Sequence, residues 1–245
     1  MLSSFAPLDT LPGFRRRFRV TPGAASVCTE VEDDYHCMRV TVHHDGATAT
    51  RIDAELIRAP WTTCPEAPAR LVQTFTGVAL AAFPARGEKQ QNCTHLYDLA
   101  VLAAAHAADA RPLVYDILVA DPLDGLRRAE IRRDGERVLA WSERGMRMAE
   151  PDEIAGLNLM GLRDWIATLE APQREAARLL QWGNIIANGR QIPIEKQSDA
   201  TRMPANCYTF QPERKGFARR VGAIRDFSNG GGAQPLDGHR LHSVA

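Results

Sequence analysis

The sequence lacks most of the patterns that identify common classes of protein. It has no Cys-x-x-Cys pair, and its five cysteines are scattered and odd in number. We therefore expect reduced thiols and not the disulfide framework of a small secreted protein. No apolar run is long enough to cross a membrane, and the first residues lack the basic and apolar segments of a signal peptide. These absences predict a cytoplasmic protein with no membrane partner.

The sequence also lacks an excess of charge of either sign. Lys and Arg together number 30, equal to Asp and Glu, so the formal net charge is zero. Generic nucleic-acid binding needs a surplus of cations to neutralise phosphates, so we expect no nucleic-acid partner. The short basic run Arg15–Arg19 is interpreted as a solvated or acid-paired segment. The sequence leaves open whether the protein forms a homo-oligomer.

Motifs for nucleotides and for established catalytic centres are absent too. There is no Gly-x-Gly-x-x-Gly after a strand, no His-Glu-x-x-His and no Gly-x-Ser-x-Gly. We therefore expect a small-molecule substrate and no nucleotide cofactor.

The 245 residues suffice for one large domain with a substantial core. We predict a lead-in at 1–13, a single domain at 14–226 and a flexible tail at 227–245. Within the domain, the core covers 14–145 and a helical extension covers 150–190.

Strand patterns are present in two groups. Residues 35–43 and 49–57 alternate apolar and polar side chains on either side of Asp45-Gly46, a hairpin-turn dipeptide. Residues 113–120, 126–133 and 136–142 form the second group, in which Asp134-Gly135 is the turn signal. The two groups predict a meandering antiparallel sheet.

Helical spacing covers most of the remaining sequence. Helices are expected at 66–82, at 94–110 and from about 151 to 187, the last divided at Ala171-Pro172 because proline favours a first turn. The fold class is therefore α+β, with a meandering antiparallel sheet packed on helices on one side and a helical C-terminal third.

Two cysteine-bearing turns carry the main chemical signal. Cys64 follows Trp61 in a proline-flanked turn, and Cys93 and His95 open the helix at residue 94. A thiol at a helix start is favoured as thiolate by the helix dipole. With Cys207, these residues could hold zinc or iron. The alternative is that the cysteines are small buried apolar residues.

Catalytic candidates surround these turns. His36 or His95 could act as acid or base near neutral pH, and Tyr97 could act as a phenolic acid. Arg58 beside Trp61 could anchor an aromatic acid, and Asp98 could orient His95. The alternative reading makes Tyr97 a core residue, Arg58 a snorkelling side chain and Asp98 a capping carboxylate.

Several of these residues also carry a family resemblance. Asp45-Gly46, Cys64, Thr76-Gly77 and the run Cys93-Thr94-His95-Leu96 resemble the bacterial domain family of unknown function number 2889, over residues 14–225. That resemblance implies no activity. The layout is more distantly similar to NifU/IscU-type iron–sulfur scaffold proteins, in which Cys64 would match the first-turn cysteine and Cys93 with His95 the helix-start pair.

Three functions follow as hypotheses. The leading one is a small-molecule enzyme that performs a lyase-type or acid–base reaction on an organic acid, aromatic acids included, at a Cys/His site. The second is a metal-binding or iron–sulfur accessory protein that uses Cys64, Cys93 and His95. The third is a non-catalytic partner subunit that docks through its helical C-terminal third.

Overall fold

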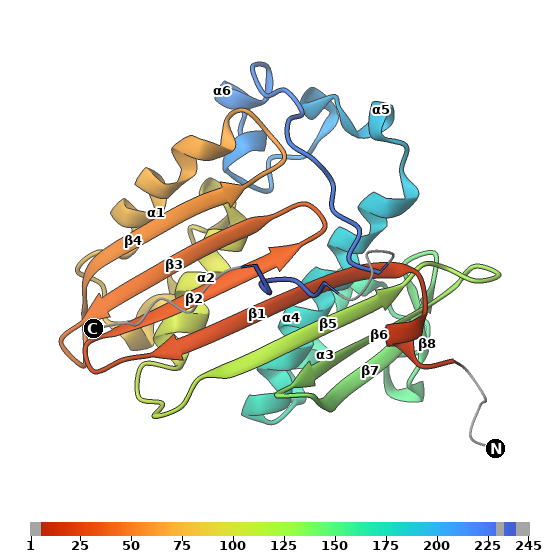
Figure 1. Cartoon of the computed structure of the whole chain (residues 1–245), viewed down its shortest axis with the longest axis horizontal. Coiled ribbons are helices and arrows are strands. Elements are labelled where there is room, and N and C mark those ends of the chain that lie inside the picture. The colour runs from red at the N-terminus through yellow and green to blue at the C-terminus, as the bar shows by residue number, and fades with distance from the viewer. Residues whose placement is uncertain (1–5, 229–232, 239–245) are drawn as a thin grey trace. The chain divides into compact units, whose positions relative to one another are not determined.

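The computed structural model describes residues 6–228 and 233–238 (Figure 1). Contacts divide the chain into two compact units. The first unit comprises 1–17, 114–193 and 226–235, and the second comprises 18–113, 194–225 and 236–245. Strand β1 (Gly13–Pro22) contributes residues to both units.

The sheet strands of the second unit run in the order β4-β3-β2-β1. Their bounds are β2 (Ser26–Asp33), β3 (Cys37–His44) and β4 (Ala49–Arg58), with antiparallel β2–β3 and β3–β4 pairs. The Asp45-Gly46 hairpin is confirmed: Gly46 has a φ of 98°, and the Asp45 carboxylate accepts hydrogen bonds from the backbone N–H groups of Ala47 and Thr48. Strand β2 was not predicted from the sequence.

Two helices pack on these strands, α1 (Ala67–Phe75) against β4 and α2 (Thr94–Ala105) against β2 and β3 (Figure 1). The prediction that the first helix reaches residue 82 is wrong. It ends at Phe75 because Thr76 is extended and Gly77 has a φ of 78°, the left-handed conformation typical after a helix. The second helix also ends before residue 110, at Ala105.

Short helices fill the rest of the second unit. They are η2 (Cys64–Glu66), η3 (Leu80–Ala85), η4 (Lys89–Gln91), α5 (Ile194–Gln197), η8 (Ala200–Arg202), η9 (Tyr208–Phe210) and α6 (Pro212–Lys215).

The first unit has the strand order β1-β5-β6-β7-β8. The bounds are β5 (Leu113–Ala120), β6 (Leu126–Arg133), β7 (Glu136–Arg144) and β8 (Arg147–Glu150). Strands β5 and β6 begin and end where the pattern predicted. The second hairpin is confirmed, since Asp134 and Gly135 both have positive φ angles, 51° and 88°. Strand β8 was not predicted.

Helices follow this second group of strands in the chain. Their bounds are α3 (Arg163–Thr168) and α4 (Ala171–Ala187), with shorter η1 (Leu8–Thr10), η5 (Asp152–Ile154), η6 (Leu159–Gly161) and η7 (Asn188–Gln191). Helix α4 packs against β6 and β7 and begins at the predicted Ala171-Pro172 boundary. The prediction of a continuous helix from 151 to 170 is wrong, because two short 3-10 turns precede α3.

The α+β class is therefore confirmed, with antiparallel meanders, helices packed on them and a largely helical C-terminal third. Within the described residues, no helix is both long and apolar enough to cross a bilayer. Much of the predicted flexible tail, residues 229–232 and 239–245, lies outside the described part of the chain.

Candidate acid–base site

The site is built on the turn that joins β2 to β3, residues 33–36. The backbone N–H of Asp33 donates to the carbonyl of His36 at 2.9 Å, which closes the turn. Its carboxylate Oδ1 accepts hydrogen bonds from the backbone N–H groups of Tyr35 at 2.7 Å and His36 at 2.8 Å. An aspartate favours such turns because its short side chain can accept from the N–H groups two and three residues later. His36 therefore lies just before β3, and not within a strand starting at Tyr35 as predicted.

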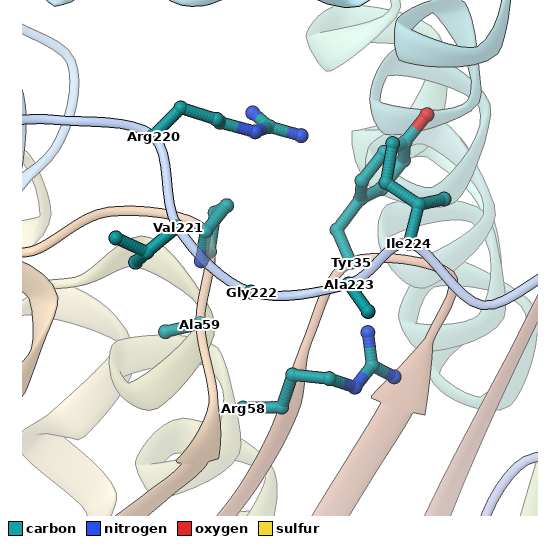
Figure 2. Close-up of a pocket in the computed structure, with 9 residues that line it drawn as sticks. Tyr35, Arg58, Ala59, Arg220, Val221, Gly222, Ala223 and Ile224 are labelled. Atoms are coloured by element: carbon teal, nitrogen blue, oxygen red, sulfur yellow. The ribbon is translucent and has the colours of Figure 1, made fainter.

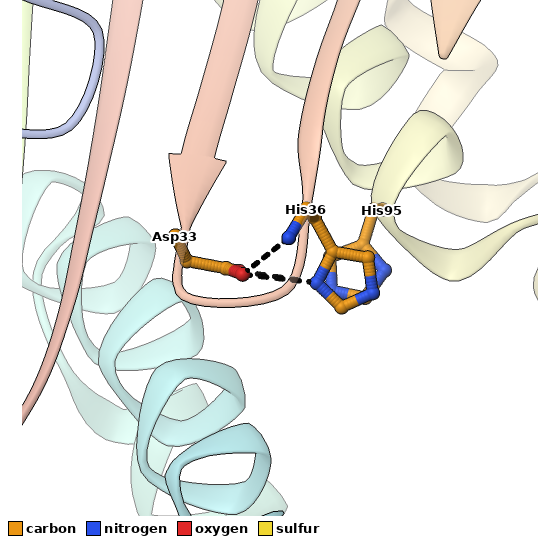
Figure 3. Close-up of side chains that lie close together, drawn as sticks. All are labelled: Asp33, His36 and His95. Carbon is orange, nitrogen blue, oxygen red and sulfur yellow. Dashed lines mark hydrogen bonds and ion pairs between the residues drawn. The ribbon is translucent and has the colours of Figure 1, made fainter. Parts of the chain in front are cut away.

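The same carboxylate orients the imidazole of His36. Nδ1 of His36 lies 3.0 Å from Asp33 Oδ1 and 3.3 Å from Oδ2 (Figure 3). A carboxylate accepts hydrogen bonds only, so this contact places a proton on Nδ1, and the neutral ring then has its lone pair on Nε2. Nε2 makes no hydrogen bond to any residue that the structure describes. A nitrogen in that state can accept a proton from another molecule.

His95 reaches this site from the first turn of α2. The hydroxyl of Thr29, a fully buried residue of β2, donates to the carbonyl of Leu99 at 3.0 Å and fixes this face of the helix on the sheet. His95 precedes Leu99 by four residues, so the two side chains share one helical face. This spacing places the His95 ring over the end of the β2–β3 hairpin.

The two imidazoles stack on each other. Their ring centroids are 3.9 Å apart and their planes differ by 29° (Figure 3). The stacking therefore holds the two rings face to face, with His36 from the β2–β3 turn and His95 from α2.

Asp33, His36 and His95 are also residue types that bind metal ions in proteins. One ligand atom each from Asp33, His36 and His95 lies within 4.8 Å of the other two, and no other such group of three occurs among residues 6–228 and 233–238. Imidazole lone pairs lie in the ring plane, however, and two stacked planes only 29° apart keep the lone pairs of the two rings in separate planes. A metal bound at about 2.0–2.1 Å to both nitrogens needs convergent lone pairs. One ring would have to rotate before both could bind one ion.

Arg58, the predicted substrate anchor, holds the turn in place. From the end of β4, its Nη2 donates to the carbonyls of Asp33 at 2.5 Å and His36 at 3.2 Å, and its Nη1 donates to that of Asp34 at 2.8 Å. The guanidinium also forms an ion pair with the buried carboxylate of Glu32 at 3.2 Å. Arg58 therefore positions Asp33 and His36 through their backbone.

The three predicted cysteine ligands, Cys64, Cys93 and Cys207, do not belong to this group of ligand atoms. Cys64 packs in an apolar cluster with Trp61 and Phe210, and partly buried Cys207 packs against that cluster. Burial and the nearby Cys64 thiol raise the pKa of Cys93 to about 12. Burial likewise raises the pKa of Cys207 to about 11 and raises that of Cys64. The expectation of a thiolate is therefore wrong, because burial opposes the charge more strongly than the helix start favours it.

Tyr97 and Asp98 have other partners. The Tyr97 ring packs on Phe75 in the core, and its hydroxyl donates to the carbonyl of Phe83 at 3.3 Å. Asp98 forms an ion pair with Lys89 at 2.6 Å. The carboxylate that orients an imidazole in the structure is that of Asp33, which binds His36, and not that of Asp98.

No protein-family model matches the chain, and a search of curated proteins finds no match. The resemblance to family 2889 and the likeness to iron–sulfur scaffolds therefore stay predictions.

Sequence reasoning singled out both histidines but missed Asp33. The available signal was Asp33 three residues before His36, the spacing of a turn whose first residue accepts from the fourth. That signal was hidden because β2 itself was not recognised.

Proposed function

We propose that this protein is a small-molecule enzyme that moves a proton on an organic acid, with His36 as the acid–base group. The observation that supports this most directly is the Asp33–His36 hydrogen bond, which leaves Nε2 of His36 as the proton acceptor. The proposal extends to lyase-type chemistry, because eliminations begin or end with the same proton transfer.

Each residue has a distinct part in this proposal. Asp33 holds the tautomer and stabilises the imidazolium that forms when Nε2 takes a proton. His95, stacked on the ring, helps to hold the His36 imidazole in its orientation. Arg58 keeps the turn in place from β4.

The test detects proton transfer itself, so it does not require the natural substrate to be identified first. The purified protein is incubated in D₂O with a panel of aryl and alkyl 2-hydroxy and 3-hydroxy acids, and deuterium incorporation at carbon is followed by NMR. We expect exchange on at least one acid, and we expect His36→Asn to slow it on the order of 10²–10⁴-fold, the usual contribution of a positioned acid or base.

His43→Asn is the matched control. His43 lies on β3, seven residues beyond His36, and pairs with Asp53 at 2.8 Å. The His43→Asn variant should exchange deuterium at the wild-type rate. Equal rates for wild type and His36→Asn would refute the proposal.

A second candidate function is metal-dependent catalysis, favoured by the mutual approach of Asp33, His36 and His95 within 4.8 Å. Zinc or iron would suit two imidazoles and one carboxylate. Here the metal would supply Lewis-acid chemistry, and His95 would have to rotate out of the stack.

Metal analysis of the purified protein separates the two candidates. Our account predicts well under one equivalent of zinc or iron, with the same low content in His95→Ala. One equivalent of metal in wild type that is lost in His95→Ala but kept in His43→Asn would favour the metal-dependent function.

A further inference from the structure

A pocket of about 350 Å³ lies beside the same turn (Figure 2). Its polar side chains come from Tyr35, Arg58 and Arg220, and the remaining walls are small or apolar residues of 59–60 and 221–224. Two of its lining residues are arginines and none is acidic. The pocket therefore combines positive charge with apolar walls.

The wall that carries Arg220 is fixed by backbone hydrogen bonds. The N–H of Val221 donates to the carbonyl of Pro60 at 3.0 Å, and the N–H of Thr62 donates to that of Arg219 at 3.0 Å. Farther along the segment, the N–H of Arg225 donates to the carbonyl of Asp34 at 2.8 Å. The pocket thus needs little ordering before it binds a ligand.

Arg220 is the arginine of the pocket that has no acidic partner among the described residues. Its guanidinium carbon lies 5.6 Å from the centroid of the Tyr35 ring and 5.5 Å from that of Trp61. Figure 2 shows the Arg220 and Tyr35 side chains at the pocket. Arg220 makes no hydrogen bond or ion pair with any residue in the described part of the chain. Partial burial lowers its pKa, because desolvation disfavours the cation. An anionic ligand would relieve that cost.

Arg58 does not compete for this role. Its Nη1 and Nη2 groups already donate to three carbonyls and to Glu32. Arg220 keeps its N–H donors available in a planar fork, the geometry that matches the two oxygens of a carboxylate.

We propose that this pocket binds a small organic carboxylate with a planar apolar body, and that Arg220 holds the carboxylate. Binding itself needs no catalysis, and only the assignment of this ligand as the substrate rests on the proposed function. The volume is near the lower end for small-molecule pockets, about 300–1,000 Å³, which suits a single ring. The apolar walls favour an organic acid over inorganic phosphate.

The test is calorimetric titration of the full chain with benzoate, with benzamide as the neutral analogue of the same shape. We expect benzoate to bind at least tenfold more tightly than benzamide, and inorganic phosphate to bind more weakly than benzoate. Arg220→Gln should weaken benzoate binding on the order of tenfold to a hundredfold, as expected for loss of a charge-assisted hydrogen bond.

Arg219→Gln is the matched control. It removes an arginine one position earlier, which is exposed and donates to the carbonyls of Gly216 and Ala218, and it should leave benzoate affinity unchanged. Arg220→Lys should keep part of the affinity, which separates loss of charge from loss of folding.

Equal affinity of wild type for benzoate and benzamide would overturn the inference, whatever the variants do. So would unchanged benzoate binding in folded Arg220→Gln, or phosphate binding as tight as that of benzoate. His36→Asn distinguishes the two proposals: it should bind benzoate normally and lose exchange. Benzoate binding without His36-dependent exchange would refute only the proposed function, and exchange without benzoate binding would refute only this inference.

Discussion

At the scale of single residues, Asp33 combines a structural role with the chemical role that we propose for it. Its carboxylate closes the β2–β3 turn through two backbone N–H groups and also accepts from the His36 ring. Asparagine can perform the first role with its carbonyl oxygen, but it lacks the charge that stabilises an imidazolium. The two roles can therefore be separated by one substitution.

We predict that Asp33→Asn lowers the free energy of unfolding by no more than about 2 kcal/mol, near the upper end for one hydrogen-bonding group. It should reduce carbon–deuterium exchange on the order of 10²-fold or more, because the imidazole loses its orienting carboxylate. Denaturant titration and NMR exchange measure the two effects. Asp45→Asn is the control, since Asp45 accepts from two backbone N–H groups in the other hairpin turn. A full exchange rate in folded Asp33→Asn would show that the carboxylate has no chemical role.

The cysteines allow a second test at this scale. With its pKa raised to about 12, Cys93 has at pH 8 a thiolate fraction on the order of 10⁻⁴, so alkylation should be slow and should accelerate as pH rises. We predict that iodoacetamide labels Cys93 and Cys64 only after denaturation, as read by peptide mass spectrometry. Rapid labelling of native Cys93 would mean that this thiol is neither buried nor protonated.

At the scale of elements, the sequence predicts those features that depend on local chemistry. Both Asp-Gly hairpins formed as expected because their turns need positive φ angles that few other residues tolerate. The Ala171-Pro172 boundary is also confirmed, because the fixed φ angle and missing N–H of proline suit the first turn of a helix. Strand β2 was missed because acids occur on a strand that is buried on both faces: Glu30 and Glu32 pair with Arg19 and Arg58, which the sequence alone does not place beside them.

Helix α4 offers a test of element packing. An added Cβ at Gly183 would lie 2.8 Å from Cγ2 of Ile117 on β5, so glycine allows the helix to approach the strand closely. Alanine favours a helix over glycine by about 0.8–1 kcal/mol, but overpacking a filled core costs about 1–3 kcal/mol.

We therefore predict that Gly183→Ala destabilises the protein by roughly 1–2 kcal/mol in denaturant unfolding, despite the better helix former. Gly161→Ala, where the added Cβ meets nothing within 4 Å, should change stability little. Stabilisation by Gly183→Ala would contradict the close approach of helix and strand.

At the scale of the whole molecule, the equal numbers of acids and bases indicate how the basic run near the N-terminus is neutralised. The basic run near the N-terminus was interpreted as solvated or acid-paired, and two of its arginines are acid-paired: Arg17 forms an ion pair with Asp116 at 2.6 Å, and Arg19 forms one with Glu30 at 2.7 Å. Composition could indicate this pairing, because equal numbers of acids and bases leave few cations for an outside polyanion.

The assembly of the site was beyond reach of the sequence. His36 and His95 are separated by 58 intervening residues, and their stacking depends on α2 packing across β2, a strand that was not recognised. Arg220 meets Tyr35 and Trp61 only through the fold. The sequence could predict which residue types take part in a site. It could not predict which of those residues lie together.

We propose that Asp33 directs His36 to move a proton on an organic acid. The most direct measurement is NMR-detected deuterium incorporation into hydroxy acids by wild type, His36→Asn and His43→Asn at equal protein concentration. We predict exchange in wild type and His43→Asn, and a loss on the order of 10²–10⁴-fold in His36→Asn. Undiminished exchange in His36→Asn, or its absence from wild type with every acid, would contradict the proposal.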